Sequence, residues 1–248
     1  MNEKYIEERF RDMYRVGILT AAICLILATT TFGEIPEIEG SADIYFTDNY
    51  FWRAAGDGNP HLQYDFGLST SIAGLGISFS PWVSHNLDNM DVDEVDYAFD
   101  LSYSILEALS VNAGVLYYDV TGIEETGEFY GALGYEIPIS EMLSMSPGIT
   151  FYYDFMEVDK PYLEASVSAG VSVFEPLSAS LSAVIGFDFG QYESDDFENG
   201  PTVLQIGVSA DYQLTEVVTL TPAFTYVLGL ADVFDNDTFL GVNIGFGF

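Results

Sequence analysis

The stretch PYLEASVSAGVSVFEPLSASLSAVIGFDF, residues 161–189, decides the fold. On each side of Glu175-Pro176, apolar residues occupy alternate positions, and mostly serine, glycine and acidic residues lie between them. Successive side chains of a β-strand point to opposite faces, so this period of two predicts two strands, each with one apolar face. The interruption at Glu175-Pro176 predicts a tight turn between them. The stretch is therefore a predicted β-hairpin.

The same alternation continues from Ser41 to Phe248. Twelve segments show it: 41–53, 61–73, 75–85, 94–105, 109–119, 128–138, 143–155, 161–173, 177–189, 202–213, 217–229 and 238–248. Most have 11 to 13 residues. Strands of soluble proteins usually have about 5–6 residues, whereas a tilted transmembrane strand needs roughly 9–11. The pattern predicts an all-β fold: a transmembrane, antiparallel, up-and-down β-barrel of about twelve strands.

The connections between these segments alternate in length. Short ones lie at Gly74, 107–108, 140–142, 175–176 and 215–216, and longer acidic ones at 86–93, 120–127, 190–201 and 231–237. Short periplasmic turns and longer extracellular loops are typical of outer-membrane barrels, with both termini in the periplasm. Pro81, Pro147 and Pro222 lie inside predicted strands, where a missing N–H donor favours a bulge or a break.

The N-terminal region has the three parts of a secretory signal peptide. Residues 1–15 are polar with four basic side chains, residues 16–32 are apolar, and Thr31 and Gly33 are the small residues of a cleavage site. We expect a signal peptide at 1–33, a short periplasmic segment at 34–40 and the barrel at 41–248. The alternative is an uncleaved transmembrane helix, for which about 17 apolar residues are barely sufficient. The barrel pattern that follows favours the signal peptide.

The charge of the chain is strongly negative, at −33, and removal of residues 1–33 would leave it unchanged because four acidic and four basic residues would go. An apolar content of 49% with 15% aromatics excludes a disordered acidic chain. Without a basic patch, nucleic acid is excluded as a partner. The one cysteine, Cys24, lies in the predicted signal, so no disulfide, no cysteine-bound metal and no cofactor is expected.

Two resemblances rest on particular residues. Phe248, with Phe246, Ile244 and Val242 alternating before it, resembles the C-terminal signal that barrel-assembly machinery recognises. Residues 41–104 resemble a family of Gram-negative barrels with Y-x-W-R-G, P-x-x-Q and E-x-D-x-x-x-x-Y motifs. The residues that carry this resemblance are Tyr50-Phe51-Trp52-Arg53, Pro60, Gln63, Trp82, Asn86 and Glu94-Val95-Asp96-Tyr97, with Ala54 in place of the motif glycine and Phe99 or Tyr103 in place of the last tyrosine. This resemblance implies a barrel and no particular activity.

The polar face of the strands is expected to line the lumen. Its candidate residues are Asp43, Asp65, Asp96, Asp100, Asp154, Glu164, Asp188, Asp211 and Trp82, and Tyr118, Tyr130, Tyr152 and Tyr162 would narrow it. Arg53 lies at the end of the 41–53 segment, on the same side as Asp43 by parity. We expect it to pair with one or more of these carboxylates, because an unpaired buried charge is costly. The pair would either pin the barrel, which we favour, or tune the selectivity of a pore.

The acidic loops contain candidate calcium ligands: Asp88, Asp91 and Asp93 in one, Asp235 and Asp237 in another. Neither has the glycine placement of an EF-hand, and the alternative is a solvated acidic rim. No enzyme is expected: the only histidines are His61 and His85, and the common catalytic motifs are missing from the sequence. An Asp–His site near His85 is conceivable, although a solvated loop histidine is favoured.

These patterns lead to ranked hypotheses. The first is a small pore in the outer membrane of a Gram-negative bacterium, passing small solutes and preferring cations because its lumen is acidic. The second is a non-conducting structural or surface-binding barrel that acts through its acidic loops, and the third is an outer-membrane hydrolase. The expected partners are outer-membrane lipid, lipopolysaccharide, the barrel-assembly machinery and divalent cations.

Overall fold

A computed structural model of the chain describes residues 37–192 and 197–248. The predicted signal peptide, 1–33, and residues 34–36 of the predicted periplasmic segment lie outside the described residues. The strands are β1 (Ile38–Thr47), β2 (Phe51–Trp52), β3 (Ala55–Gly56), β4 (His61–Ile72), β5 (Leu75–Asn86), β6 (Asp91–Leu106), β7 (Leu109–Val120), β8 (Thr126–Tyr135), β9 (Ile137–Pro138), β10 (Leu143–Asp154), β11 (Pro161–Phe174), β12 (Leu177–Asp188), β13 (Gly200–Thr215), β14 (Val218–Gly229) and β15 (Asp237–Gly247). In the described ranges, no helix is long and apolar enough to cross a membrane.

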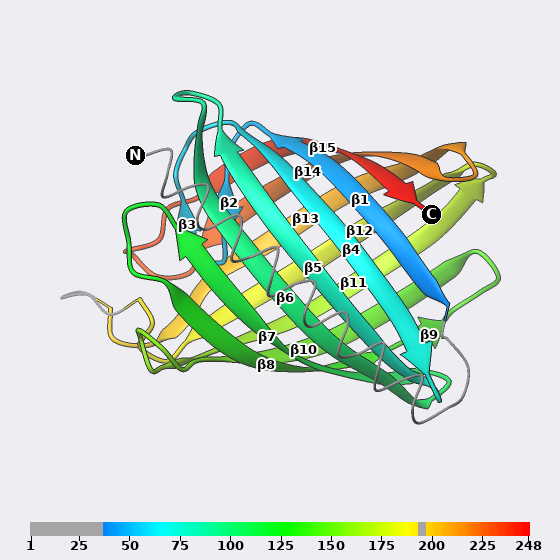
Figure 1. Cartoon of the computed structure of the whole chain (residues 1–248), viewed down its shortest axis with the longest axis horizontal. Helices are drawn as coiled ribbons and strands as arrows, with labels where there is room; N and C mark the ends of the chain where they lie inside the picture. The colour runs from blue at the N-terminus through cyan, green and yellow to red at the C-terminus, as the bar shows by residue number, and fades with distance from the viewer. Residues whose placement is uncertain (1–36, 193–196) are drawn as a thin grey trace.

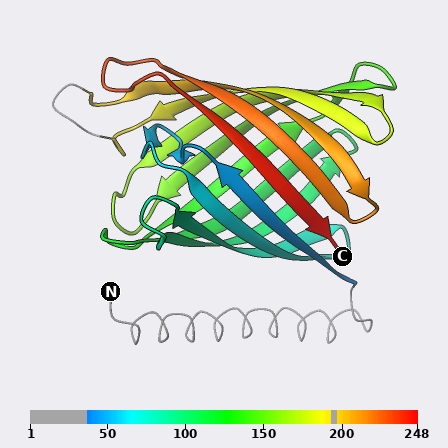
Figure 2. The same ribbon diagram turned by 90° about the horizontal axis from the view of Figure 1, so that it is seen from above.

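The long strands form one closed antiparallel barrel (Figures 1 and 2). Each pairs with its neighbours in sequence, and β1 closes the cylinder by pairing with both β4 and β15. Short β9 continues β8 along β10, so the barrel has twelve strands. The predicted up-and-down barrel of twelve strands is confirmed.

The strand bounds differ from the prediction mainly at one place. The predicted 41–53 strand ends as β1 at Thr47, and the chain then forms a separate two-stranded hairpin, β2–β3, that does not join the barrel sheet. Thr47 and Asp48-Asn49 explain the break, because the Thr47 hydroxyl donates to the Asn49 carbonyl at 2.7 Å and closes a local turn. The strands β6 and β13, at 16 residues each, are longer than predicted.

The three prolines lie within continuous strands, so the predicted bulge or break does not occur there. Each pairs with one neighbouring strand: Pro81 with Tyr97, Pro147 with Val167 and Pro222 with Val242. On the other side of Pro81, the register passes from Asp65–Trp82 to Leu68–Phe79 without a shift. The missing N–H of the proline thus removes hydrogen bonds to one neighbouring strand and leaves the pairing with the other neighbouring strand intact.

The two faces of the barrel wall have opposite chemistry. Large apolar side chains on the outer face are exposed, and among them are Phe66 (53%), Phe129 (53%), Leu181 (53%) and Leu240 (57%). Buried polar and charged side chains, such as His61 and Glu128, lie on the inner face. An apolar exterior around a polar interior is the reverse of a soluble protein and matches a barrel surrounded by lipid.

The two ends of the barrel differ in their connections. Tight turns gather at one end, the turn end, together with Ile38 and Gly247; there Ala73 and Gly74 both have positive φ, as a two-residue hairpin turn requires. Long connections gather at the other end, the loop end: 48–60, 87–90, 121–125, 155–160, 230–236 and the described parts of the connection between β12 and β13, 189–192 and 197–199. This alternation agrees with the predicted short turns and long loops.

Candidate functional site

The connection after β1 folds back into the loop end of the lumen (Figures 1 and 2). We call residues 50–57 the inner hairpin; its ends meet where the Asp57 N–H donates to the Tyr50 carbonyl at 3.1 Å. Arg53 lies in its turn with φ of 51°, in the left-handed region. Sequence parity placed Arg53 on the first barrel strand, and this is wrong, because β1 has already ended at Thr47.

The inner hairpin contacts the wall on many sides of the lumen. The Tyr50 hydroxyl donates to Glu94 of β6 at 2.7 Å, and the Tyr50 ring lies 6.0 Å from that of Trp82 of β5. Two further ring pairs join Phe51 to Phe239 of β15 and Trp52 to Tyr118 of β7. On the opposite side, Gln205 of β13 donates to the Arg53 carbonyl at 3.0 Å. Because these strands surround the lumen, the hairpin crosses its cross-section.

Arg53 forms a buried two-pronged ion pair with Glu128 of β8. Its Nη1 and Nη2 donate to Oε1 and Oε2 at 2.7 and 2.5 Å, and the two side chains are 4% and 2% exposed. Planar guanidinium and carboxylate groups match in this geometry, which is the strongest form of the pair. We expected Arg53 to pair with one or more of the lumen carboxylates named from the sequence, but its partner is Glu128, which was not among them.

Three aromatic rings enclose the same guanidinium group. Its Cζ lies 4.2 Å from the ring centroid of Tyr152, 4.3 Å from that of Trp52 and 4.8 Å from that of Tyr162. Tyr162 is fully buried, and Gly186 makes room for it, since a Cβ there would lie 2.0 Å from the Tyr162 hydroxyl. Aromatic faces attract cations within about 6 Å, so the rings and Glu128 act together on the Arg53 charge.

Glu128 has further donors besides Arg53. The Tyr118 hydroxyl donates to its Oε2 at 2.9 Å, and the Gln191 amide donates to Oε1 at 3.2 Å. The Gln191 Oε1 in turn accepts from Arg53 at 3.1 Å. Sequence reasoning did not select Glu128 or Gln191. The alternation offered a signal for Glu128, which lies two residues before Tyr130, itself named as inward-pointing.

A second buried cluster lies at the base of the inner hairpin. His61 is 0% exposed; its Nε2 lies 2.8 Å from Asp57, its Nδ1 lies 2.7 Å from the Ser84 hydroxyl, and Asp93 is 3.6 Å away. Asp57, His61 and Asp93 each offer a possible metal-ligating atom within 4.8 Å of the others. Both ring nitrogens already have hydrogen-bonding partners, so these contacts account for the cluster. His61, rather than His85, is the histidine beside carboxylates; the His85 ring packs edge-on against Tyr64.

Five predicted lumen carboxylates accept hydrogen bonds from neighbouring wall residues. Asp43 accepts from Asn243 at 2.6 Å, Asp65 from Ser80 at 2.7 Å, and Asp211 from Thr221 at 2.7 Å. Asp100 accepts from Ser78 at 3.5 Å and Glu164 from Tyr152 at 3.3 Å. These carboxylates are distributed along the inner wall and do not converge on one point.

Asp154 and Asp188 have a different role from the other predicted lumen residues. The Asp154 Oδ1 accepts from the backbone N–H groups of residues 156–158, and Thr126 donates to its Oδ2 at 2.6 Å. Asp188 accepts in the same way from the N–H groups of residues 190–192. Both are at most 2% exposed. They hold the start of a long connection, so we assign them to loop architecture.

Trp82 and Asp96 face each other across the β5–β6 pair. One oxygen of Asp96, Oδ1, is buried without a hydrogen-bond partner among the described residues. Most of the residues that carry the sequence resemblance, among them Tyr50, Arg53 and Glu94, thus gather around the inner hairpin.

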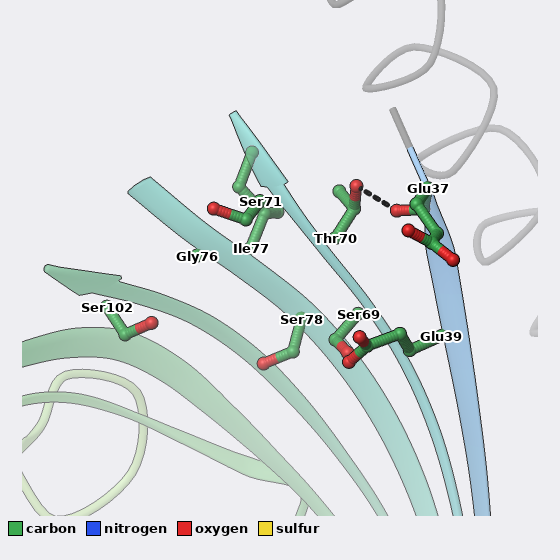
Figure 3. A pocket seen from close by; sticks show the side chains of 9 residues that line it. All are labelled: Glu37, Glu39, Ser69, Thr70, Ser71, Gly76, Ile77, Ser78 and Ser102. Atoms are coloured by element: carbon green, nitrogen blue, oxygen red, sulfur yellow. Dashed lines mark hydrogen bonds between the residues drawn. The ribbon is translucent and has the colours of Figure 1, made fainter. Parts of the chain in front are cut away.

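The turn end of the lumen is hollow. A cavity of about 440 Å³ lies on the inner side of β1, β4, β5 and β6, with Glu37, Glu39 and several serine hydroxyls around it (Figure 3). Small residues face each other across these strands: a Cβ on Gly76 would lie 2.2 Å from the Ser102 hydroxyl, and one on Gly67 2.3 Å from that of Ser41. The wall itself therefore leaves space that the inner hairpin does not reach.

The remaining predicted sites lie at the two rims. Asp88, Asp91 and Asp235 are exposed, whereas Asp237 accepts from Asn49 at 2.6 Å and Asp93 lies beside His61. Calcium binding at these residues stays a prediction. At the turn end, Phe248 and Gly40 exchange two backbone hydrogen bonds of 2.7 and 2.9 Å, and Phe246 pairs with Ala42 and Val218 in the closing strand.

Comparisons with known proteins bear on the fold. No family model matches the chain, and no curated relative matches it in sequence. Many solved structures match, among them the NanC porin (12% identity, TM-score 0.54, 82% of this chain and 97% of that one), an outer-membrane channel from Pseudomonas putida F1 (10%, 0.57, 87% and 96%) and the KdgM porin (10%, 0.55, 84% and 99%). At such identities the likeness shows the fold alone, which is that of outer-membrane porins.

Proposed function

We propose that the chain is a narrow, cation-preferring pore for small solutes in the outer membrane of a Gram-negative bacterium. The porin fold and the exposed apolar outer face support the membrane location. The turn end would face the periplasm and the loop end the outside. A cleaved signal at 1–33, recognition of Phe246 and Phe248 by the assembly machinery, and contact of the acidic rim with divalent ions and lipopolysaccharide belong to the same proposal.

The observation that carries the cation preference is the charge of the inner wall. Asp43, Asp65, Asp100, Glu164 and Asp211 face the lumen, whereas Arg53, the only lysine or arginine beyond residue 36 besides Lys160, is paired with Glu128. A lumen with many carboxylates and one neutralised cation carries a negative potential. Such a potential concentrates cations and repels anions.

A non-conducting barrel is the second candidate, because the loop end is filled. Taken as whole residues, Arg53 is 6% exposed, Glu128 2%, and His61 and Tyr162 0%. If the inner hairpin stays in place, solute has to pass around it. The barrel would then act through its surface loops.

Single-channel recording of refolded protein in a planar bilayer, under a KCl gradient, separates the two candidates. Arg53→Gly is the matched variant, since glycine adopts the φ of 51° without strain. A pore predicts a cation-selective reversal potential, with a larger conductance for Arg53→Gly than for the natural chain. If neither protein conducts, although the far-UV circular dichroism spectrum of each shows that it is folded, the pore is refuted and the second candidate remains.

A further inference from the structure

The surroundings of Arg53 form a complete recognition site for a guanidinium group. Almost all of it comes from the barrel wall and its loops: Glu128 from β8, Tyr152 from β10, Tyr162 from β11, and Gln191 from the connection after β12. We call these four residues the guanidinium pocket. The Arg53 side chain that fills it belongs to a different piece of chain, the inner hairpin, which is not part of the barrel sheet.

The chemistry of the pocket is selective among cations. Two carboxylate oxygens meet two N–H groups at 2.7 and 2.5 Å, and a third acceptor, the Gln191 Oε1, lies 3.1 Å from Nη1. A planar fork donates two parallel N–H···O bonds to Glu128 from separate nitrogens, a geometry that the single nitrogen of an ammonium group cannot match. The ring faces at 4.2 and 4.8 Å add attraction for a flat, weakly hydrated cation.

The pocket is held in shape independently of Arg53. Glu128 also accepts from Tyr118 and Gln191, Tyr162 is fixed by a 2.9 Å hydrogen bond to Thr202, and Gln191 donates to the Lys160 carbonyl at 3.0 Å. Withdrawal of the Arg53 side chain would therefore leave Glu128 with two donors and an open place for a cation. The acidic lumen would supply that place with cations.

We infer that the guanidinium pocket is a binding site for small alkylguanidinium solutes, and that Arg53 is an internal occupant that such solutes displace. This inference rests on the proposed pore, because the lumen brings the solute to the pocket. Binding at Glu128 releases the Arg53 side chain from the lumen wall, so the same solute that enters the pore opens space beside the inner hairpin. Methylguanidinium is the simplest probe. Methylammonium and tetramethylammonium are controls that carry the same charge without the planar pair of N–H donors.

The test is calorimetric titration of refolded Arg53→Gly with methylguanidinium in detergent. Saturable binding is expected, on the order of tenfold tighter than that of methylammonium, because the fork adds a second charge-assisted hydrogen bond. Arg53→Gly combined with Glu128→Gln should lose this preference, and the natural chain should bind more weakly than Arg53→Gly because Arg53 competes. The inference would be overturned if the three cations bound with equal affinity. It would also be overturned if the preference for methylguanidinium persisted when Glu128→Gln is added to Arg53→Gly.

A second measurement covers the case in which Arg53→Gly does not refold. The natural chain, recorded in the bilayer, should show larger current steps in methylguanidinium than in tetramethylammonium of the same concentration, and Glu128→Gln should remove the difference. Identical steps in both salts would contradict the inference. Calorimetric binding without any conductance would instead contradict the pore and leave the pocket intact, so the two proposals fail separately.

Discussion

The two halves of the lumen have walls of the same alternating strands and are filled in opposite ways. At the loop end, His61, Glu128 and Tyr162 are at most 2% exposed beneath the inner hairpin. At the turn end, serine and glycine leave a cavity of about 440 Å³. The difference arises from the 48–60 connection, which folds into the loop end, and from the small serine and glycine residues of the wall at the turn end. A barrel wall alone therefore does not determine whether its lumen is open.

The largest expected effect comes from removing Glu128. Glu128→Ala leaves the buried Arg53 charge without its carboxylate, so we expect the free energy of unfolding to fall by about 3–5 kcal/mol. Urea titration of the refolded barrel in lipid vesicles measures it. Asp211→Asn, at a partly exposed carboxylate of the hollow half, is the control and should cost less than about 1 kcal/mol. Equal losses in the two variants would show that the halves do not differ in stability.

The turn of the inner hairpin supplies the next prediction. Arg53→Gly and Arg53→Ala both remove the ion pair, but only alanine is strained at a φ of 51°. We expect the glycine variant to be more stable by about 1 kcal/mol, measured in the same urea titration. An alanine variant of equal stability would mean that the turn relaxes once the guanidinium is gone, and that the ion pair holds the backbone in place.

A larger side chain in the turn-end cavity tests whether the hollow half of the lumen carries the current. Ser78→Phe adds a ring to the turn-end cavity, so the conductance should fall while the free energy of unfolding changes by no more than about 0.5 kcal/mol. Leu101→Phe, at an outer-face position that is 37% exposed, is the control and should leave the conductance unchanged. If Ser78→Phe conducts like the natural chain, the turn-end cavity does not limit the current, and the prediction is wrong.

The smallest effect is expected at Asp65. It lies directly opposite Asp43 in the β1–β4 pair, and like charges at such positions repel each other. Asp65→Asn should therefore raise the free energy of unfolding by roughly 0.2–1 kcal/mol and lower the cation preference of the pore. The reversal potential at low salt reports the second effect. A destabilised variant would show that the 2.7 Å bond from Ser80 outweighs the repulsion.

The alternation in the sequence predicted the barrel. Each strand has lipid on one side and a polar lumen on the other, so apolar and polar residues alternate along it. The prediction failed after Thr47, since the aromatic run Tyr50-Phe51-Trp52 has the composition of a strand but lies in a hairpin that packs against the lumen wall. The turn residues Asp48-Asn49 were the available signal for the break. The sequence also could not identify the partner of Arg53. Glu128 is 75 positions away, and the alternation shows only which carboxylates point inward, not which one contacts Arg53.

The closing pair of strands has a consequence for how the barrel is made. β1 and β15 meet along seven residue pairs, and Asp43 and Asn243, joined by a hydrogen bond, are 200 positions apart in sequence. Contacts between such distant residues form slowly, because the intervening chain has to be ordered first. Until they form, β1 and β15 each present an unpaired edge to any other strand. During assembly, pairing of β1 with β15 therefore competes with pairing of either strand with a second chain. An assembly factor would have to shield those two edges until the barrel closes.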